Sequence, residues 1–85
     1  MNYQEKYPDE SIVSAIHRAI EECNSLISTK SIVSEITGLT LYNPKFYKMP
    51  GPERRYLARK VTDYMAERYE MYACNARGPT WRITK

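Results

Sequence analysis

The sequence predicts a single α+β domain in which three helices are followed by a C-terminal β-hairpin. Apolar residues recur at three- and four-residue steps through most of the chain, which is the period of helices with one buried face. The last residues instead form two β-prone runs around a turn-rich segment, which is typical of a hairpin. A chain of 85 residues has room for one compact core.

The first long helix is expected over roughly residues 10–25, after an irregular N-terminal arm at residues 1–8. Asp9 is a suitable N-cap, because its carboxylate accepts bonds from the free N–H groups of the first turn. We expect residues 26–27 to leave the helix as a short extended piece, so that the domain proper spans residues 9–85. The helix and this piece share one apolar face: Ile12, Ile16, Ala19, Ile20, Cys23, Leu26 and Ile27.

A second, shorter helix of about two turns is expected from Lys30 to Thr37. Ser28 and Thr29 precede it as capping residues. Gly38 suits the left-handed backbone position that ends a helix. This short helix is therefore bounded by a recognisable signal at each end.

A long connection over residues 39–51 separates the second helix from the third. Its prolines rule out a continuous helix, although Asn43 and Pro44 are suited to begin a short helical turn. The connection holds too many apolar and aromatic residues for a plain solvated loop, so we expect part of it to pack on the core. The third helix opens at Pro52 and is expected to end at about residue 69.

The third helix combines two unlike faces. Leu57, Val61 and Met65 lie on the side expected to face the core. The opposite side and its flanks are polar and mostly cationic, and they carry Arg54, Arg55, Tyr56, Arg59, Lys60 and Thr62.

The C-terminal hairpin is expected to pair residues 71–74 with residues 80–84. The residues between these two runs are typical of a turn. Trp81 and Ile83 share one face of the second run. We therefore expect Trp81 to anchor the hairpin to the core.

The net charge of +3 conceals an uneven distribution. Residues 1–43 hold three basic and six acidic residues, whereas residues 44–85 hold ten basic and four acidic ones. A strongly basic second half is typical of a surface that binds a polyanion.

Other classes of protein fit the composition poorly. The sequence shows no secretory signal and no apolar run of the roughly 20 residues that a membrane span needs, so a cytoplasmic protein without a membrane partner is expected. Cys23 and Cys74 form no metal-binding pair and His17 is the single histidine, so no metal or other cofactor is expected. We expect both cysteines to be core residues, with a disulfide between them as the alternative. No nucleophile, metal cluster or glycine-rich phosphate loop indicates an enzyme or a small-molecule substrate.

The order of helix, extended piece, short helix, long helix and hairpin resembles the winged helix-turn-helix family, particularly the small regulators of archaea, their viruses and their plasmids. Three segments carry the resemblance: residues 28–39 (STKSIVSEITGL) as the positioning helix and turn, residues 54–61 (RRYLARKV) as the recognition helix, and residues 77–82 (RGPTWR) as the wing. The long connection departs from the family, whose two helices are normally joined by a turn of three or four residues.

The resemblance implies a transcription regulator that binds double-stranded DNA at specific sequences. In that family the third helix enters the major groove and the wing reaches the backbone or the minor groove. Arg55, Arg59 and Thr62 would then lie at the groove, with Arg54, Tyr56 and Lys60 beside them. The further candidate contacts lie in the hairpin (Arg77, Arg82), at the start of the second helix (Ser28, Thr29, Lys30) and in the connection (Lys45, Lys48).

Two other partners remain open from the sequence. A protein–protein module is the main alternative, with Tyr3, Tyr7, Tyr42 and Tyr47 as interface residues, and the regulator itself is compatible with a homodimer. Structured RNA is the third option, although its narrow major groove would not admit the third helix.

Overall fold

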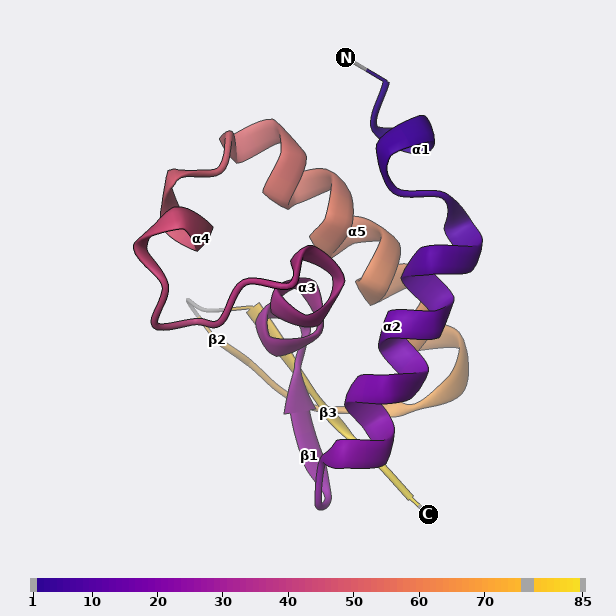
Figure 1. The fold of residues 1–85 in the computed structure, drawn as a ribbon. Coiled ribbons are helices and arrows are strands. Elements are labelled where there is room, and N and C mark those ends of the chain that lie inside the picture. The colour runs from indigo at the N-terminus through magenta and orange to yellow at the C-terminus, as the bar shows by residue number, and fades with distance from the viewer. Residues whose placement is uncertain (1, 76–77, 85) are drawn as a thin grey trace.

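The computed structural model describes residues 2–75 and 78–84, and it forms an α+β domain of five helices and one three-stranded sheet (Figure 1). The helix number differs from the expected three because one turn of the N-terminal arm and one turn of the long connection are also helical. In chain order the elements are α1 (Tyr3–Lys6), α2 (Asp9–Glu22), β1 (Leu26–Ser28), α3 (Thr29–Thr37), α4 (Pro44–Lys48), α5 (Gly51–Arg68), β2 (Glu70–Asn75) and β3 (Gly78–Arg82).

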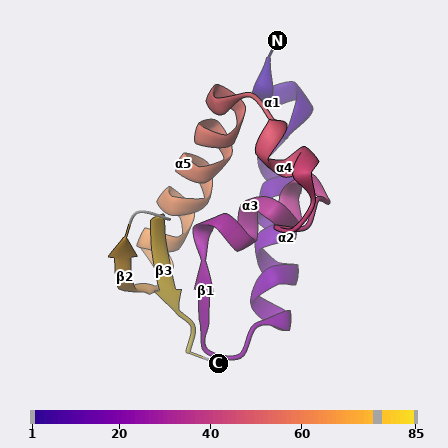
Figure 2. The same cartoon turned by 90° about the vertical axis from the view of Figure 1, so that its left-hand side faces the viewer.

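The sheet confirms the expected hairpin and the short extended piece. Strand β3 lies in the middle, antiparallel to both β1 and β2, and Figure 2 shows the three strands side by side. Trp81 stands opposite Ile27 on one side and Met71 on the other. A bulge between Met71 and Ala73 shifts the register of β2. Because β1 runs directly into α3, its pairing with β3 ties the hairpin to the start of that helix.

The core is formed where α2, α3 and α5 meet the sheet. Ile16, Ile32, Leu57 and Trp81 are almost completely buried there, and the anchoring role expected of Trp81 is confirmed. Phe46 of α4 is also buried, so the long connection does pack on the core. The apolar face expected over the first helix and the extended piece is confirmed except at Leu26: Ile27 is buried and Cys23 is half-buried against the core, whereas Leu26 is 42% exposed.

The ends of the helices match the sequence signals in part. Gly38 has a φ of 73° and ends α3, as expected. Asn43 accepts a hydrogen bond from the Lys45 N–H and caps α4. The expected Asp9 cap is wrong, because Pro8 occupies the N-cap position and Asp9 is the first residue of α2. Helix α2 also ends at Glu22, earlier than expected.

The N-terminal arm is not irregular, because α1 forms one helical turn capped by Asn2, which accepts a 2.9 Å hydrogen bond from the Gln4 N–H. No side chain of α1 is buried, so the turn is held by contacts at its surface. The Lys6 ammonium lies 2.9 Å from a carboxylate oxygen of Glu53. Glu53 belongs to the first turn of α5 and is only 4% exposed. The arm thus neutralises a buried carboxylate at the start of α5.

The contacts that α1 and the start of α2 make with α5 predict that stability falls at alkaline pH. The hydrogen bonds to Glu53 and Asp9 raise the pKa of Lys6 and Lys60 above the usual 10.5, and burial raises the pKa of Tyr7 above the usual 10.0. The folded chain therefore holds these protons more tightly than the unfolded chain, so the stabilisation is complete below these usual values and is lost as the pH rises through the folded pKa values. Urea unfolding across that range should show the loss, and it should be smaller in a Lys6→Met, Tyr7→Phe variant.

The cysteines correct another expectation. Cys23 is half-buried, and its thiol donates to the carbonyl oxygen of Ile20 at 3.2 Å. Cys74 is exposed on β2 rather than buried in the core. No disulfide joins the two.

Candidate nucleic-acid interface

A groove of about 620 Å³ runs along the side of α5 that carries Arg55 and Arg59. Its opposite wall is made by the start of α3, by Phe46 of α4, and by Gly78 and Pro79 of the hairpin. In Figure 2, α5 and the hairpin lie on the left, and α3 and α4 lie to their right. The residues of α5 that line it include Arg54, Arg55, Arg59 and Thr62, so the structure brings together four candidates from the helix. We call this feature the arginine groove.

The arginine groove is strongly cationic. Its lining includes four cationic side chains, those of Arg54, Arg55, Arg59 and Lys30, against the single carboxylate of Asp63. Arg55 and Arg59 are exposed, whereas Arg54 and Lys30 are half-buried. Like charges gathered in a concave surface reinforce one another's field, so the groove favours an anionic ligand.

Two details describe the surroundings of the Arg55 and Arg54 side chains. An ideal Cβ at Gly51 would lie 3.0 Å from Nη1 of Arg55, so the absence of a side chain at Gly51 leaves room for that guanidinium. The Nε of Arg54 is buried and has no hydrogen-bond partner among the described residues. Proteins rarely leave a buried donor unpaired, because this costs about 1–3 kcal/mol.

Thr29 connects the three elements that border the groove. It is the first residue of α3 and is 4% exposed. Its hydroxyl oxygen accepts a 2.9 Å hydrogen bond from the Trp81 indole N–H and lies 3.4 Å from the hydroxyl oxygen of Thr62. The sequence suggested a phosphate contact through the backbone N–H of Thr29, and its side chain has the separate role of joining β3, α3 and α5.

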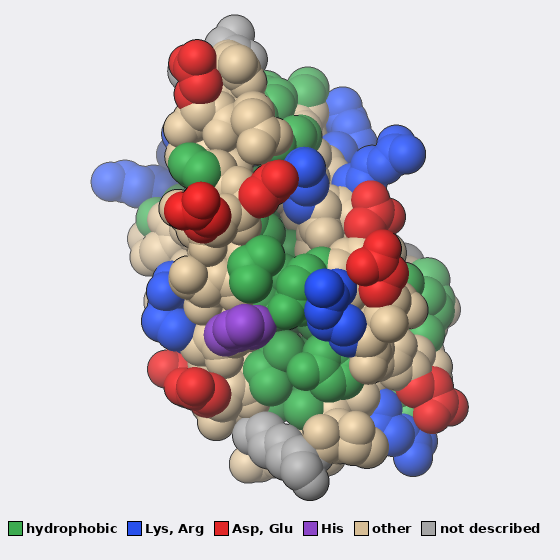
Figure 3. All heavy atoms as spheres, turned by 90° about the vertical axis from the view of Figure 1, so that its right-hand side faces the viewer, with side chains coloured by type: hydrophobic (Ala, Val, Ile, Leu, Met, Phe, Trp, Pro, Cys, Tyr) green, Lys and Arg blue, Asp and Glu red, His purple; other side chains and the backbone are tan. Residues whose placement is uncertain are grey.

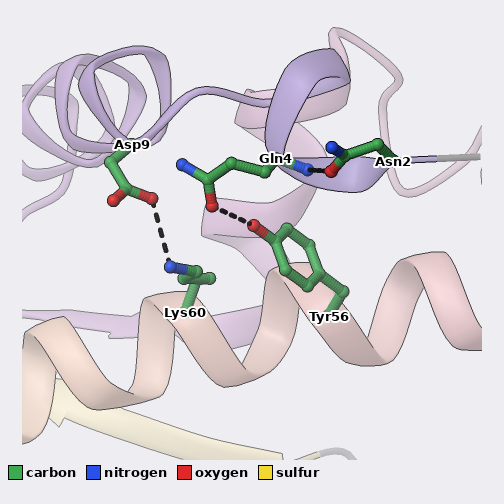
Figure 4. Close-up of polar contacts among 5 residues, drawn as sticks. All are labelled: Asn2, Gln4, Asp9, Tyr56 and Lys60. Atoms are coloured by element: carbon green, nitrogen blue, oxygen red, sulfur yellow. Dashed lines mark hydrogen bonds and ion pairs between the residues drawn. The ribbon is translucent and has the colours of Figure 1, made fainter.

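Tyr56 and Lys60 lie away from the groove, on the flank of α5 that faces the N-terminal arm (Figure 4). The Tyr56 hydroxyl donates to Oε1 of Gln4 at 3.1 Å, and its ring lies 5.5 Å from that of Tyr3. Lys60 forms an ion pair with Asp9 at 3.1 Å. Tyr56 therefore holds the arm and Lys60 holds the start of α2 against α5, and neither lines the arginine groove.

The remaining candidates among the described residues do not line the groove. Lys45 and Lys48 are exposed on α4, and the Arg82 guanidinium lies 5.2 Å from the ring centre of Tyr72. Ser28 caps α3 by accepting a hydrogen bond from the Ser31 N–H at 3.1 Å. Arg77, the candidate at the hairpin turn, lies outside the described residues.

A second hollow of about 520 Å³, which the sequence does not predict, adjoins the arginine groove. Tyr42 and Tyr47 of the long connection line it together with Lys30, and Lys30 and Gly78 also line the groove. We call this feature the tyrosine hollow. No periodic pattern in residues 39–51 indicates where these rings point, so the sequence suggested them only as general interface residues.

The opposite side of the molecule has a different character. Figure 3 shows basic and acidic side chains interspersed there around hydrophobic ones, beside the histidine. His17 is exposed, and its Nε2 lies 2.9 Å from the Tyr64 hydroxyl. The Arg68 guanidinium lies 3.8 Å from the centre of the Tyr64 ring. Arg68 also pairs with Glu67 at 3.2 Å, whereas no arginine of the groove forms an ion pair with another described residue.

No protein-family model, curated protein or solved structure matches this chain. Within the described ranges, His, Cys, Asp and Glu side chains form no group of three or more that is placed to hold a metal ion. None of the helices described here has both the length and the apolar character needed to cross a membrane.

Proposed function

We propose that the protein is a transcription regulator of the winged helix-turn-helix type that binds double-stranded DNA at specific sequences. The observation that carries the proposal is the arginine groove, in which one exposed helix face and the start of another helix present four cations against one acid. Duplex DNA is the polyanion that fits best, because its phosphates suit a cationic groove and its major groove is wide enough to admit the helix that carries the exposed Arg55 and Arg59.

The arrangement of elements supports this class of protein. Strand β1 lies between α2 and α3 in the chain, and the sheet order is β1-β3-β2, so a hairpin flanks the long helix as a wing does. The order is compatible with α3 as the positioning helix and α5 as the recognition helix. Residues 38–50 replace the usual short turn between them, and α4 within that segment packs Phe46 into the core.

Each groove residue has a defined task in this proposal. Arg55 and Arg59, the two exposed arginines, read base edges, since a guanidinium forms two parallel hydrogen bonds to O6 and N7 of guanine. Lys30 and Arg54 contact phosphates and set the position of α5 on the duplex.

A duplex titration at two ionic strengths tests the proposal. We expect binding at low salt and a steep loss of affinity as salt rises, because each phosphate neutralised releases condensed counterions. With two phosphate contacts, those of Lys30 and Arg54, log Kd should rise with log salt with a slope of about 2. Fluorescence anisotropy of a labelled duplex measures this, and a duplex RNA of the same sequence should compete poorly. Absence of duplex DNA binding at low salt would contradict the proposal.

Selection from a random duplex pool tests sequence specificity separately. Recovered sequences should share a motif with guanines, because two arginines face the major groove in the proposed complex. Recovery of unrelated sequences with equal affinity would show a nonspecific DNA-binding protein instead.

A further inference from the structure

The tyrosine hollow contains one aromatic ring that is both exposed and restrained. Tyr47 is 48% exposed, yet its ring packs edge-on against the buried ring of Phe46, with a centroid distance of 5.3 Å and an interplanar angle of 85°. The Lys30 ammonium lies 4.7 Å from the Tyr47 ring centre. Two neighbours therefore fix the Tyr47 ring while part of it stays open to a ligand.

The second ring of the hollow is almost entirely in solvent. Tyr42 is 97% exposed, although a tyrosine gains free energy when its large ring is covered. It lines the same hollow as Tyr47. A flat ligand that stacks on the Tyr47 ring would therefore also provide a surface against which the Tyr42 ring can pack.

The hollow continues directly from the arginine groove, since Lys30 and Gly78 line both. Lys45 and Lys48 are exposed on α4, the same short helix that carries Tyr47. A nucleic-acid strand that leaves the groove past Lys30 thus meets aromatic rings with further cations on the same element. This combination of a positive path with aromatic rings is the one that binds single-stranded nucleic acids.

Base pairing determines whether a nucleobase can stack on the tyrosine rings. In a duplex, both faces of each base are covered by neighbouring pairs, and only base edges are open in the grooves. An unpaired base offers its face for stacking. We propose that the tyrosine hollow binds an unpaired nucleobase in a single-stranded extension of the duplex held in the arginine groove. The inference rests on the proposed function and adds a preference for duplexes that carry single-stranded ends.

Anisotropy titrations of the full chain with three labelled ligands test the inference. The first is a blunt duplex, the second is the same duplex with a few unpaired adenosines at its 5′ or 3′ end, and the third replaces those adenosines by abasic nucleotides. The abasic ligand keeps the added phosphates and removes the bases. Of the two duplexes with adenosines at the 5′ or at the 3′ end, we expect the tighter-binding one to bind about tenfold to a hundredfold more tightly than its abasic counterpart.

Matched variants locate the effect. Tyr47→Ala should remove the difference between adenosine and abasic extensions, Tyr47→Phe should retain it, and Tyr42→Ala should reduce it. All three should bind the blunt duplex as the unmodified chain does, which also shows that they are folded.

The failures of the two proposals are distinguishable. Equal affinity for adenosine and abasic extensions, with the blunt duplex still bound, overturns the role of the tyrosine hollow alone. A difference that persists in a Tyr42→Ala, Tyr47→Ala variant also overturns it. If none of the three ligands binds at low salt, the proposed function itself is overturned.

Discussion

Replacing Arg55 and Arg59 together by alanine is expected to weaken binding of duplex DNA about a hundredfold or more. Both side chains are exposed and line the arginine groove, and a well-placed arginine contact to guanine is worth about 1–3 kcal/mol. Neither forms a salt bridge with another described residue. The melting temperature should therefore change little, and anisotropy together with thermal unfolding measures both quantities.

Arg68→Ala provides a matched control on the same helix. It removes one positive charge where the double variant removes two, and Arg68 lies over Tyr64 and beside Glu67 rather than in the groove. Its effect on duplex affinity should be within about threefold, the size of a general charge effect on a surface screened by salt. If the double variant binds as tightly as the Arg68 variant, the outer face of α5 is not the DNA-binding face.

Replacing Thr29 by valine is expected to cause the largest loss of stability among the polar substitutions near the groove. Valine keeps the branched shape but cannot accept the hydrogen bond of the Trp81 indole N–H, and that indole is 1% exposed. A buried donor left unpaired costs about 1–3 kcal/mol. For a domain of this size the melting temperature should fall by roughly 4–8 °C for each kcal/mol lost.

Two further variants separate the hydrogen bond from packing. Thr29→Ser keeps the hydroxyl and should lose only about the 1 kcal/mol of one buried methyl group. In a Trp81→Phe background, which has no indole donor, Thr29→Val should cost much less than in the unmodified chain, since the pair is coupled. Equal costs in both backgrounds would show that the hydrogen bond does not contribute to stability.

The long elements could be predicted because their sequences repeat a physical requirement many times. Ile12, Ile16 and Ala19 each satisfy the helical period of α2 and are buried. Gly38 marks the end of α3 because it supplies a left-handed backbone conformation. The helical turn α1 gave no such signal, since none of its side chains is buried and it depends on contacts with α5, more than 40 residues away.

The candidate site was only partly predictable for a related reason. The helical period separates Arg55 and Arg59 from the core side, and the structure places both in one groove. The same period cannot tell which flank of α5 another element will cover, and α1 and α2 take up the flank of Tyr56 and Lys60. Thr29 was expected to face a phosphate because it begins a helix. Its role as an acceptor for Trp81 depends on strand pairing between distant segments.

The hydrogen bond between Trp81 and Thr29 makes this protein convenient to observe by NMR. Trp81 is the single tryptophan, so the spectrum contains one indole N–H resonance. Its proton points to the hydroxyl that also borders the arginine groove. The chemical shift of this one resonance should therefore respond to occupation of the groove, and its rate of exchange with deuterium should report how often the junction of β3, α3 and α5 opens.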